Sequence, residues 1–143
     1  MEAKHFFYEF GRALYHLDAV YDDFAKESEV APTLLWILYA LNDGRAHTQK
    51  EICTDWALPK STVSTVMSEL KSQEYVTFTP IKGKRREMTV LLTESGKSYA
   101  NQILAKIYAR EAVAFSQLTK NEKELANILT KLTKLLKEEN KLV

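Results

Sequence analysis

The stretch from Thr48 to Thr93 constrains the fold most, because its hydrophobic pattern changes from helical to strand-like within a short distance. Two short helical patterns come first, and two runs of strand-like residues, 76–78 and 88–92, follow them. The runs are joined by Lys82-Gly83-Lys84-Arg85-Arg86, a cationic sequence that contains a turn-forming glycine. This order predicts two short helices followed by a basic β-hairpin.

Periodic apolar residues on both sides of this stretch predict longer helices. Spacings of three and four from Phe6 to Phe24 predict a helix over roughly residues 3–27. A second, almost wholly apolar helix follows Pro32, which suits a first helical turn, and ends at residues 42–44. After the hairpin, residues 93–96 begin a helix that runs to about residue 117, and a capping box at 119–122 opens a terminal helix.

The two short helices carry their own start signals. Thr48-Gln49-Lys50-Glu51 matches a capping box, in which the Thr48 hydroxyl caps the helix and the Glu51 side chain reaches back. This helix is expected to run to about Trp56. Ser61-Thr62 opens the next helix, whose apolar face is formed by Val63, Val66, Met67 and Leu70.

Composition limits the class of protein. The 143 residues fit one domain, and no apolar run approaches the 18 residues that a membrane-spanning helix needs. The single cysteine cannot form an intramolecular disulfide, and the N-terminal residues lack a signal-peptide pattern, which favours a cytoplasmic protein. Because the sequence has no phosphate loop, nucleophile motif or metal-ligand spacing, we expect no enzyme activity, cofactor or metal.

Positive charge gathers in the middle of the chain, although the whole chain has a net charge of only +1. Residues 1–44 have three Lys/Arg against eight Asp/Glu, a net −5, whereas residues 45–86 have eight against four, a net +4. Residues 87–143 have a net +2. A helix fits the major groove of duplex DNA, and a cationic loop can reach phosphates or the minor groove. A solvated basic surface explains the charge alone equally well.

Three sequence blocks resemble the MarR family of winged-helix transcriptional regulators. They are Thr48-Gln49-Lys50-Glu51-Ile52, the segment 61–66 followed by Leu70, and residues 90–96, which are similar to the family's "V-x-L-T-x-x-G" junction after the wing. The resemblance covers essentially the whole chain. It implies a mainly α fold with a small wing of two or three β-strands, in which residues 1–143 form one MarR-type domain. Residues 31–93 would be the winged helix-turn-helix lobe, and 1–30 and 94–143 the dimerisation helices.

The resemblance also implies a function. We expect a homodimer that binds a roughly palindromic operator in double-stranded DNA. Repression of a promoter is favoured over activation. The alternative is a dimer that uses its winged helix to bind protein without specific DNA binding. The residues expected to contact DNA are Thr48 and Gln49 on the third helix, Lys60, Ser61, Thr62, Ser64, Thr65 and Ser68 on the fourth, and Lys82, Lys84, Arg85 and Arg86 on the hairpin.

Each group of predicted DNA contacts has a simpler interpretation. Ser61 and Thr62 are favoured as caps that also contact DNA, but capping alone would explain them. The hairpin cations could form a solvated tip that protects an exposed strand. Two positions depart from the family pattern: Lys84 replaces an aspartate that would pair with Arg86, and Glu74 replaces a common turn glycine, which favours a different turn there.

Small aromatic or phenolic acids are effectors in the family that the sequence resembles. Tyr15, His16, Trp36 and Tyr39 could line such a site, although aromatic residues at helical spacing more often belong to the core. Cys53 is expected to be a buried structural thiol rather than a redox sensor, because no cation is evident beside it.

Overall fold

The computed structural model describes residues 2–138, and the chain divides into two compact units, Met1–Ala105 and Lys106–Val143. The helices of the first unit follow the predicted order, with bounds close to those expected from the sequence. They are α1 (Glu2–Glu27), α2 (Pro32–Leu41), α3 (Gln49–Asp55) and α4 (Lys60–Ser72), and α5 (Glu94–Gln117) begins in this unit. None of the described helices is long and apolar enough to span a membrane.

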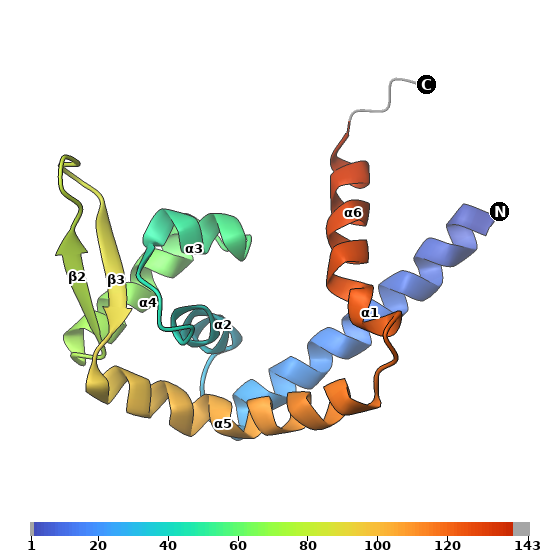
Figure 1. Ribbon diagram of the computed structural model, residues 1–143, viewed down its shortest axis with the longest axis horizontal. Coiled ribbons are helices and arrows are strands. Elements are labelled where there is room, and N and C mark those ends of the chain that lie inside the picture. Colours follow the sequence, from blue (N-terminus) through green and yellow to red (C-terminus); the bar gives the residue numbers. More distant parts are fainter. Residues whose placement is uncertain (1, 139–143) are drawn as a thin grey trace. The chain divides into compact units, whose positions relative to one another are not determined.

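The sheet has three antiparallel strands in the order β1-β3-β2. β2 (Val76–Pro80) and β3 (Met88–Leu92) form the predicted hairpin, in which Phe78 lies opposite Val90. β1 (His47–Thr48) pairs with the other edge of β3 and brings the start of α3 to the sheet. The hairpin turn projects beyond the helices of this unit (Figure 1). Its bend uses Gly83, whose φ of +84° favours glycine.

The core of the first unit lies between the helices and the sheet. Its largest fully buried side chains come from five elements: Leu35, Ile37 and Leu38 of α2, Ile52 of α3, Val63 and Met67 of α4, Val90 of β3 and Leu104 of α5. α3 packs on α4, and α2 packs on α4 and β3. The predicted apolar face of α4 is therefore confirmed, and burial of that face fixes which side of the helix remains exposed.

The capping box at α3 is only half formed. The Glu51 backbone N–H donates to the Thr48 hydroxyl at 3.0 Å, as predicted. The Glu51 side chain does not accept a bond from the Thr48 N–H in return. It faces His47 instead, with 3.6 Å between a carboxylate oxygen and Nδ1. The reciprocal half of this prediction was wrong, because the neighbouring imidazole competes for the same carboxylate.

The junction between the sheet and α5 is held by hydrogen bonds around one turn. The Thr93 hydroxyl donates to the Glu74 carbonyl at 2.7 Å and accepts from the Gly96 N–H at 3.0 Å, while the Thr93 N–H donates to the Tyr75 carbonyl at 2.9 Å. Glu74 has a φ of +62°, so it adopts the left-handed conformation that glycine favours. The sequence-based expectation of a different turn was wrong, because this hydrogen-bonded junction imposes the conformation.

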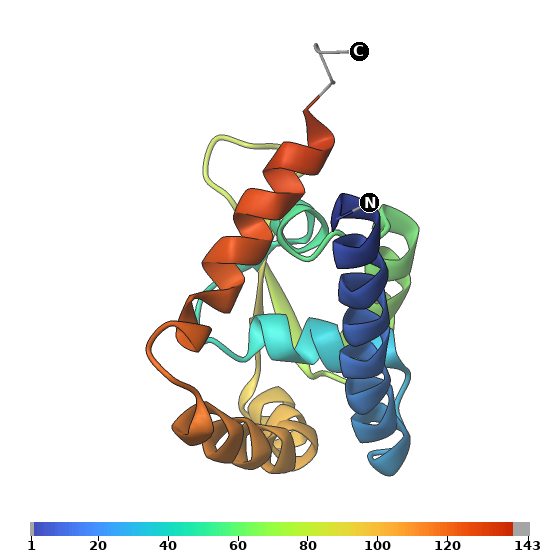
Figure 2. The ribbon, with the colours of Figure 1, turned by 90° about the vertical axis from the view of Figure 1, so that its right-hand side faces the viewer.

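The second unit contains the C-terminal half of α5, a 3₁₀ turn at Glu122–Glu124 and α6 (Leu125–Lys137). The capping box that precedes α6 is complete. The Thr119 N–H donates to the Glu122 carboxylate at 2.8 Å, and the Glu122 N–H donates to the Thr119 hydroxyl at 3.3 Å. Figure 2 shows the loop that this box closes between the end of α5 and α6. The predicted capping box is confirmed, but it precedes the 3₁₀ turn, and α6 itself begins later, at Leu125.

Candidate nucleic-acid interface

The exposed face of α4 is formed by short polar side chains and one lysine. Lys60, Ser61, Ser64, Thr65 and Ser68 are exposed and Thr62 is half-buried. These residues lie opposite the buried face of the helix, so the predicted set occupies one continuous surface. Hydroxyl groups and a flexible ammonium are suited to hydrogen bonds with base edges and phosphates.

The first turn of α4 has no side-chain cap. The N-cap residue is Pro59, and no side chain accepts a hydrogen bond from the first N–H groups of the helix. The prediction that Ser61 and Thr62 cap this helix was therefore wrong, because the helix begins before them, at Lys60. The Thr65 hydroxyl donates to the Ser61 carbonyl at 3.0 Å, while the Ser61 hydroxyl has no partner within residues 2–138.

The hairpin carries four cations around its turn, and only one of them is paired. The Lys84 ammonium lies 3.2 Å from the Glu87 carboxylate. Lys82, Arg85 and Arg86 have no hydrogen-bond or ion-pair partner among the described residues. The sequence analysis did not identify Glu87, which provides a carboxylate close to the position where the family pattern places one. This carboxylate pairs with the lysine and leaves the guanidinium of Arg86 free.

A groove of about 300 Å³ brings the hairpin and the start of α3 together. It is lined by Thr48, Gln49 and Lys50 of the α3 end and by Phe78, Arg86, Glu87 and Met88 of the hairpin. A second groove of about 300 Å³ adds Lys84 beside Thr48 and Lys50. Predicted contact residues that are far apart in the sequence thus lie on one surface, which we call the α3–hairpin groove.

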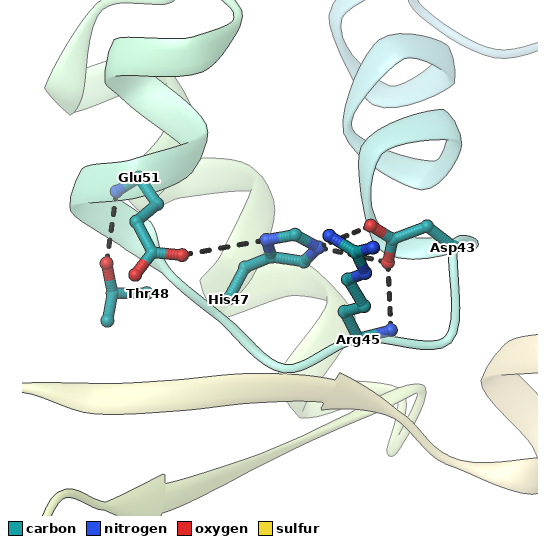
Figure 3. Close-up of polar contacts among 5 residues, drawn as sticks. All are labelled: Asp43, Arg45, His47, Thr48 and Glu51. Carbon is teal, nitrogen blue, oxygen red and sulfur yellow. Dashed lines mark hydrogen bonds and ion pairs between the residues drawn. The ribbon is translucent and has the colours of Figure 1, made fainter.

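Charged side chains surround His47 at the edge of this groove (Figure 3). Its Nε2 lies 2.8 and 2.9 Å from the two carboxylate oxygens of Asp43, and one of these oxygens accepts from the Arg45 N–H at 2.9 Å. Burial acts to raise the pKa of Asp43, but the hydrogen bonds from Arg45 and His47 and their charges lower it overall. The carboxylate is therefore held in its charged form.

The structure separates the four residues predicted for an effector site into two sets. Trp36 and Tyr39 lie 5.6 Å apart by ring centroids, within a cluster completed by Tyr21 and Trp56. Tyr15 is 76% exposed, and neither it nor His16 contacts these rings in the part of the chain that the structure describes. Tyr21 follows Tyr15 by six positions in α1, which places the two on different faces of the helix. Cys53 is half-buried.

The fold and these sequence blocks agree with known proteins. The model of the MarR family matches residues 30–87, which include α2, α3, α4, β2 and the hairpin turn. The chain is therefore similar to the MarR family over these elements. The repressor NicR of Pseudomonas putida, an HTH-type transcriptional repressor, is 28% identical over 118 residues, covering 82% of this chain and 73% of NicR. A transcriptional repressor is thus among the proteins that this chain resembles.

Solved structures share the same fold. The MarR family regulator NMB1585 of Neisseria meningitidis has a TM-score of 0.79 and 26% identity, with 90% of this chain and 91% of NMB1585 covered. BpsR of Bordetella bronchiseptica has a TM-score of 0.64 and 20% identity, with 92% and 93% covered. The BpsR structure concerns the regulation of its DNA binding by 6-hydroxynicotinic acid. At this identity the likeness to BpsR shows the fold alone.

Proposed function

We propose that this protein is a homodimeric, sequence-specific DNA-binding regulator of the MarR family that acts as a repressor. The exposed face of α4 enters the major groove, and the hairpin cations contact the phosphates and the minor groove beside it. The observation that carries the proposal is the α3–hairpin groove, which places Thr48, Gln49 and Arg86 on one surface. Unpaired cations on that surface favour a polyanionic partner.

Salt dependence tests this proposal, because each phosphate contact releases counterions from duplex DNA. A bound duplex is first selected from a random library, and its affinity is then measured by fluorescence anisotropy at several salt concentrations. We expect Arg86→Ala to weaken binding and to reduce the slope of log K against log salt by about one unit. Lys26→Ala is the matched control, because this exposed cation lies at the end of α1 and should leave the slope unchanged.

Two results would contradict different parts of the proposal. A failure of the selection to recover any common motif, together with weak binding that all duplexes share, would favour a winged-helix dimer that binds protein, for which we expect no steep salt dependence with duplex DNA. An equal salt slope for the wild type and Arg86→Ala would contradict the contact between the hairpin and phosphates.

A second copy of the chain would cover apolar side chains that are exposed in each unit. In α1 these include Phe6, Leu14 and Leu17, and in α6 Ile128 and Leu136. Apolar surface of this extent is normally covered in an assembly. We expect a dimer by light scattering, with operator half-sites about one helical turn apart. Ile128→Glu, at a side chain 57% exposed, should give a folded monomer with weak operator binding, whereas an unchanged dimer would contradict this interface.

The aromatic cluster is the proposed effector site. Trp36 and Tyr39, with Trp56, offer stacking surface for a small aromatic acid, and such a ligand lowers operator affinity by its preference for one conformation of the protein. Both tryptophans of the chain belong to this cluster, so their fluorescence reports directly on it. We expect 6-hydroxynicotinate to quench the fluorescence and to release the duplex. Release of the duplex by the ligand without any change in tryptophan fluorescence would contradict the site.

A further inference from the structure

His47 lies between two carboxylates that approach opposite sides of its ring (Figure 3). Asp43 contacts Nε2 at 2.8 Å, and Glu51 lies 3.6 Å from Nδ1. The histidine is largely enclosed, with a side chain 16% exposed, whereas the side chains of Asp43 and Glu51 are 41% and 55% exposed. We call Asp43, His47 and Glu51 the histidine bridge. No metal site explains it, because the carboxylates face different ring nitrogens, and no metal-binding group of three such residues occurs within residues 2–138.

The two contacts have different requirements for protons. A neutral imidazole has one N–H donor and one lone pair, so it can donate to only one of the two carboxylates. Its lone pair then faces the other carboxylate, which is repulsive. The imidazolium donates to Asp43 and also attracts Glu51 by its charge, at a distance of 3.6 Å that is an ion pair and not a hydrogen bond. The complete bridge therefore needs a protonated histidine.

The bridge joins the turn after α2 to the first turn of α3. Asp43 lies in that turn, His47 begins β1, and Glu51 lies in the first turn of α3, whose N-cap is Thr48. Thr48 and Glu51 also line the groove that contains Lys84. Protonation of His47 thus changes the net charge at the N-terminal end of α3, and it changes how tightly Glu51 is held there. This is the helix end that we place against DNA.

Other charged groups also lie around His47. Arg45, in the same turn, donates its backbone N–H to Asp43 and adds a positive charge beside it. From α3, Lys50 lies beside Glu51 in the groove, and from the hairpin Glu87 is paired with Lys84. Across β3, His47 pairs with the apolar Val90. With a neutral histidine, Arg45 and Lys50 balance Asp43 and Glu51, and protonation gives these groups a net positive charge.

We infer that the histidine bridge links operator binding to pH: the protein takes up a proton at His47 when it binds DNA. This inference rests on the proposed function. A phosphate that approaches Thr48 is a further anion near the imidazole, so it favours the imidazolium. By linkage, the protonated protein binds the duplex more tightly. Operator affinity therefore falls as pH rises through the range in which histidines titrate.

The test is operator affinity between pH 6 and pH 8.5 at constant ionic strength. We expect the wild type to bind about fivefold more tightly at pH 6 than at pH 8.5, the size of a partly screened charge interaction. His47→Gln keeps a hydrogen-bond donor but cannot titrate, so its affinity should not depend on pH. Glu51→Gln removes one carboxylate and should reduce the dependence without removing it. Calorimetry in two buffers with different ionisation enthalpies should show proton uptake on binding by the wild type only.

The control is His16→Gln, because His16 is exposed on α1 and away from the bridge. It should keep the pH dependence of the wild type. An equal pH dependence in His47→Gln and the wild type, or its loss in His16→Gln, would overturn the inference.

The same binding measurements separate this inference from the proposed function. A wild type that binds the selected duplex equally tightly at pH 6 and pH 8.5 would overturn the inference alone. A wild type that binds no duplex at any pH would instead overturn the proposed function and, with it, the link to DNA.

Discussion

Replacing Gly96 by alanine should destabilise the protein, although alanine is the better helix former. Gly96 is buried in the first turn of α5, and a Cβ built on it would lie 1.9 Å from the Tyr75 carbonyl oxygen and 2.8 Å from its carbon. Both atoms belong to the backbone, so no side-chain rotation can relieve the contact. The same carbonyl accepts the Thr93 N–H, and the Tyr75 ring stacks on Tyr99 with centroids 4.4 Å apart.

The expected magnitude follows from opposing contributions. Overpacking costs about 1–3 kcal/mol, and weakening the hydrogen bond to Tyr75 costs about 1 kcal/mol. The higher helix propensity of alanine offsets about 1 kcal/mol of this loss of stability. We therefore expect Gly96→Ala to lose about 1–3 kcal/mol, which lowers the melting temperature by about 3–9 °C for a chain of this size.

Urea unfolding at fixed protein concentration measures this loss, since association contributes to stability. The matched control is Ser98→Ala, an exposed position in the same helix, which should be neutral or gain a few tenths of a kcal/mol. If Gly96→Ala were as stable as the wild type, the close approach of α5 to the Tyr75 backbone would be wrong. Steric exclusion of a side chain would then not explain why glycine occupies position 96.

Three further changes test other parts of the structure. Glu74→Gly should raise the unfolding free energy by about 0.5 kcal/mol, because glycine removes the backbone strain of a side-chain-bearing residue in the left-handed conformation. A loss of stability would contradict this. The lowered pKa of Asp43 gives stability that is present at neutral pH and lost in acid, so Asp43→Asn should cost about 0.5 kcal/mol at pH 7 and nothing at pH 3. Burial, together with the charge of Tyr75, raises the pKa of Tyr99, so stability should fall above about pH 10, and less steeply in Tyr99→Phe. Chemical unfolding across pH measures both.

The sequence predicted the helices and the hairpin well because their signals are local. The apolar face of α4, the start of α2 at Pro32 and the turn at Gly83 depend on residues a few positions apart. β1 was missed as a separate strand because its two residues become a strand only by pairing with β3, more than forty positions along the chain. Propensity contains no information about such a distant partner.

Side-chain partners were predicted less well than helices. The side chain of Glu51 was expected to complete a capping box, but His47 competes for it. Ser61 and Thr62 were expected to cap α4, but the helix begins one residue earlier. Glu87 and Trp56 were missed as parts of the groove and of the aromatic cluster, because both contacts join different elements. A carboxylate adjacent to the hairpin cations was the available signal for Glu87.

Two geometrical facts group the predicted DNA-contacting residues, one for α4 and one for the start of α3 and the hairpin. Burial of one face of α4 leaves its hydroxyl-bearing face exposed, and β1 holds the start of α3 beside β3. The first could be derived from helical periodicity. The second depends on the pairing of β1 with β3, so the groove between α3 and the hairpin could not be predicted from the sequence alone.

Chemical modification of lysines, with and without the selected duplex, shows directly which surface faces DNA. We expect DNA to protect the amines of Lys60, Lys82 and Lys84, which lie at the start of α4 and around the hairpin turn. Lys26, at the end of α1, and Lys134, in α6, should react equally in both samples. If Lys60 and the hairpin lysines reacted at the same rate with and without bound duplex, the proposed interface would be wrong.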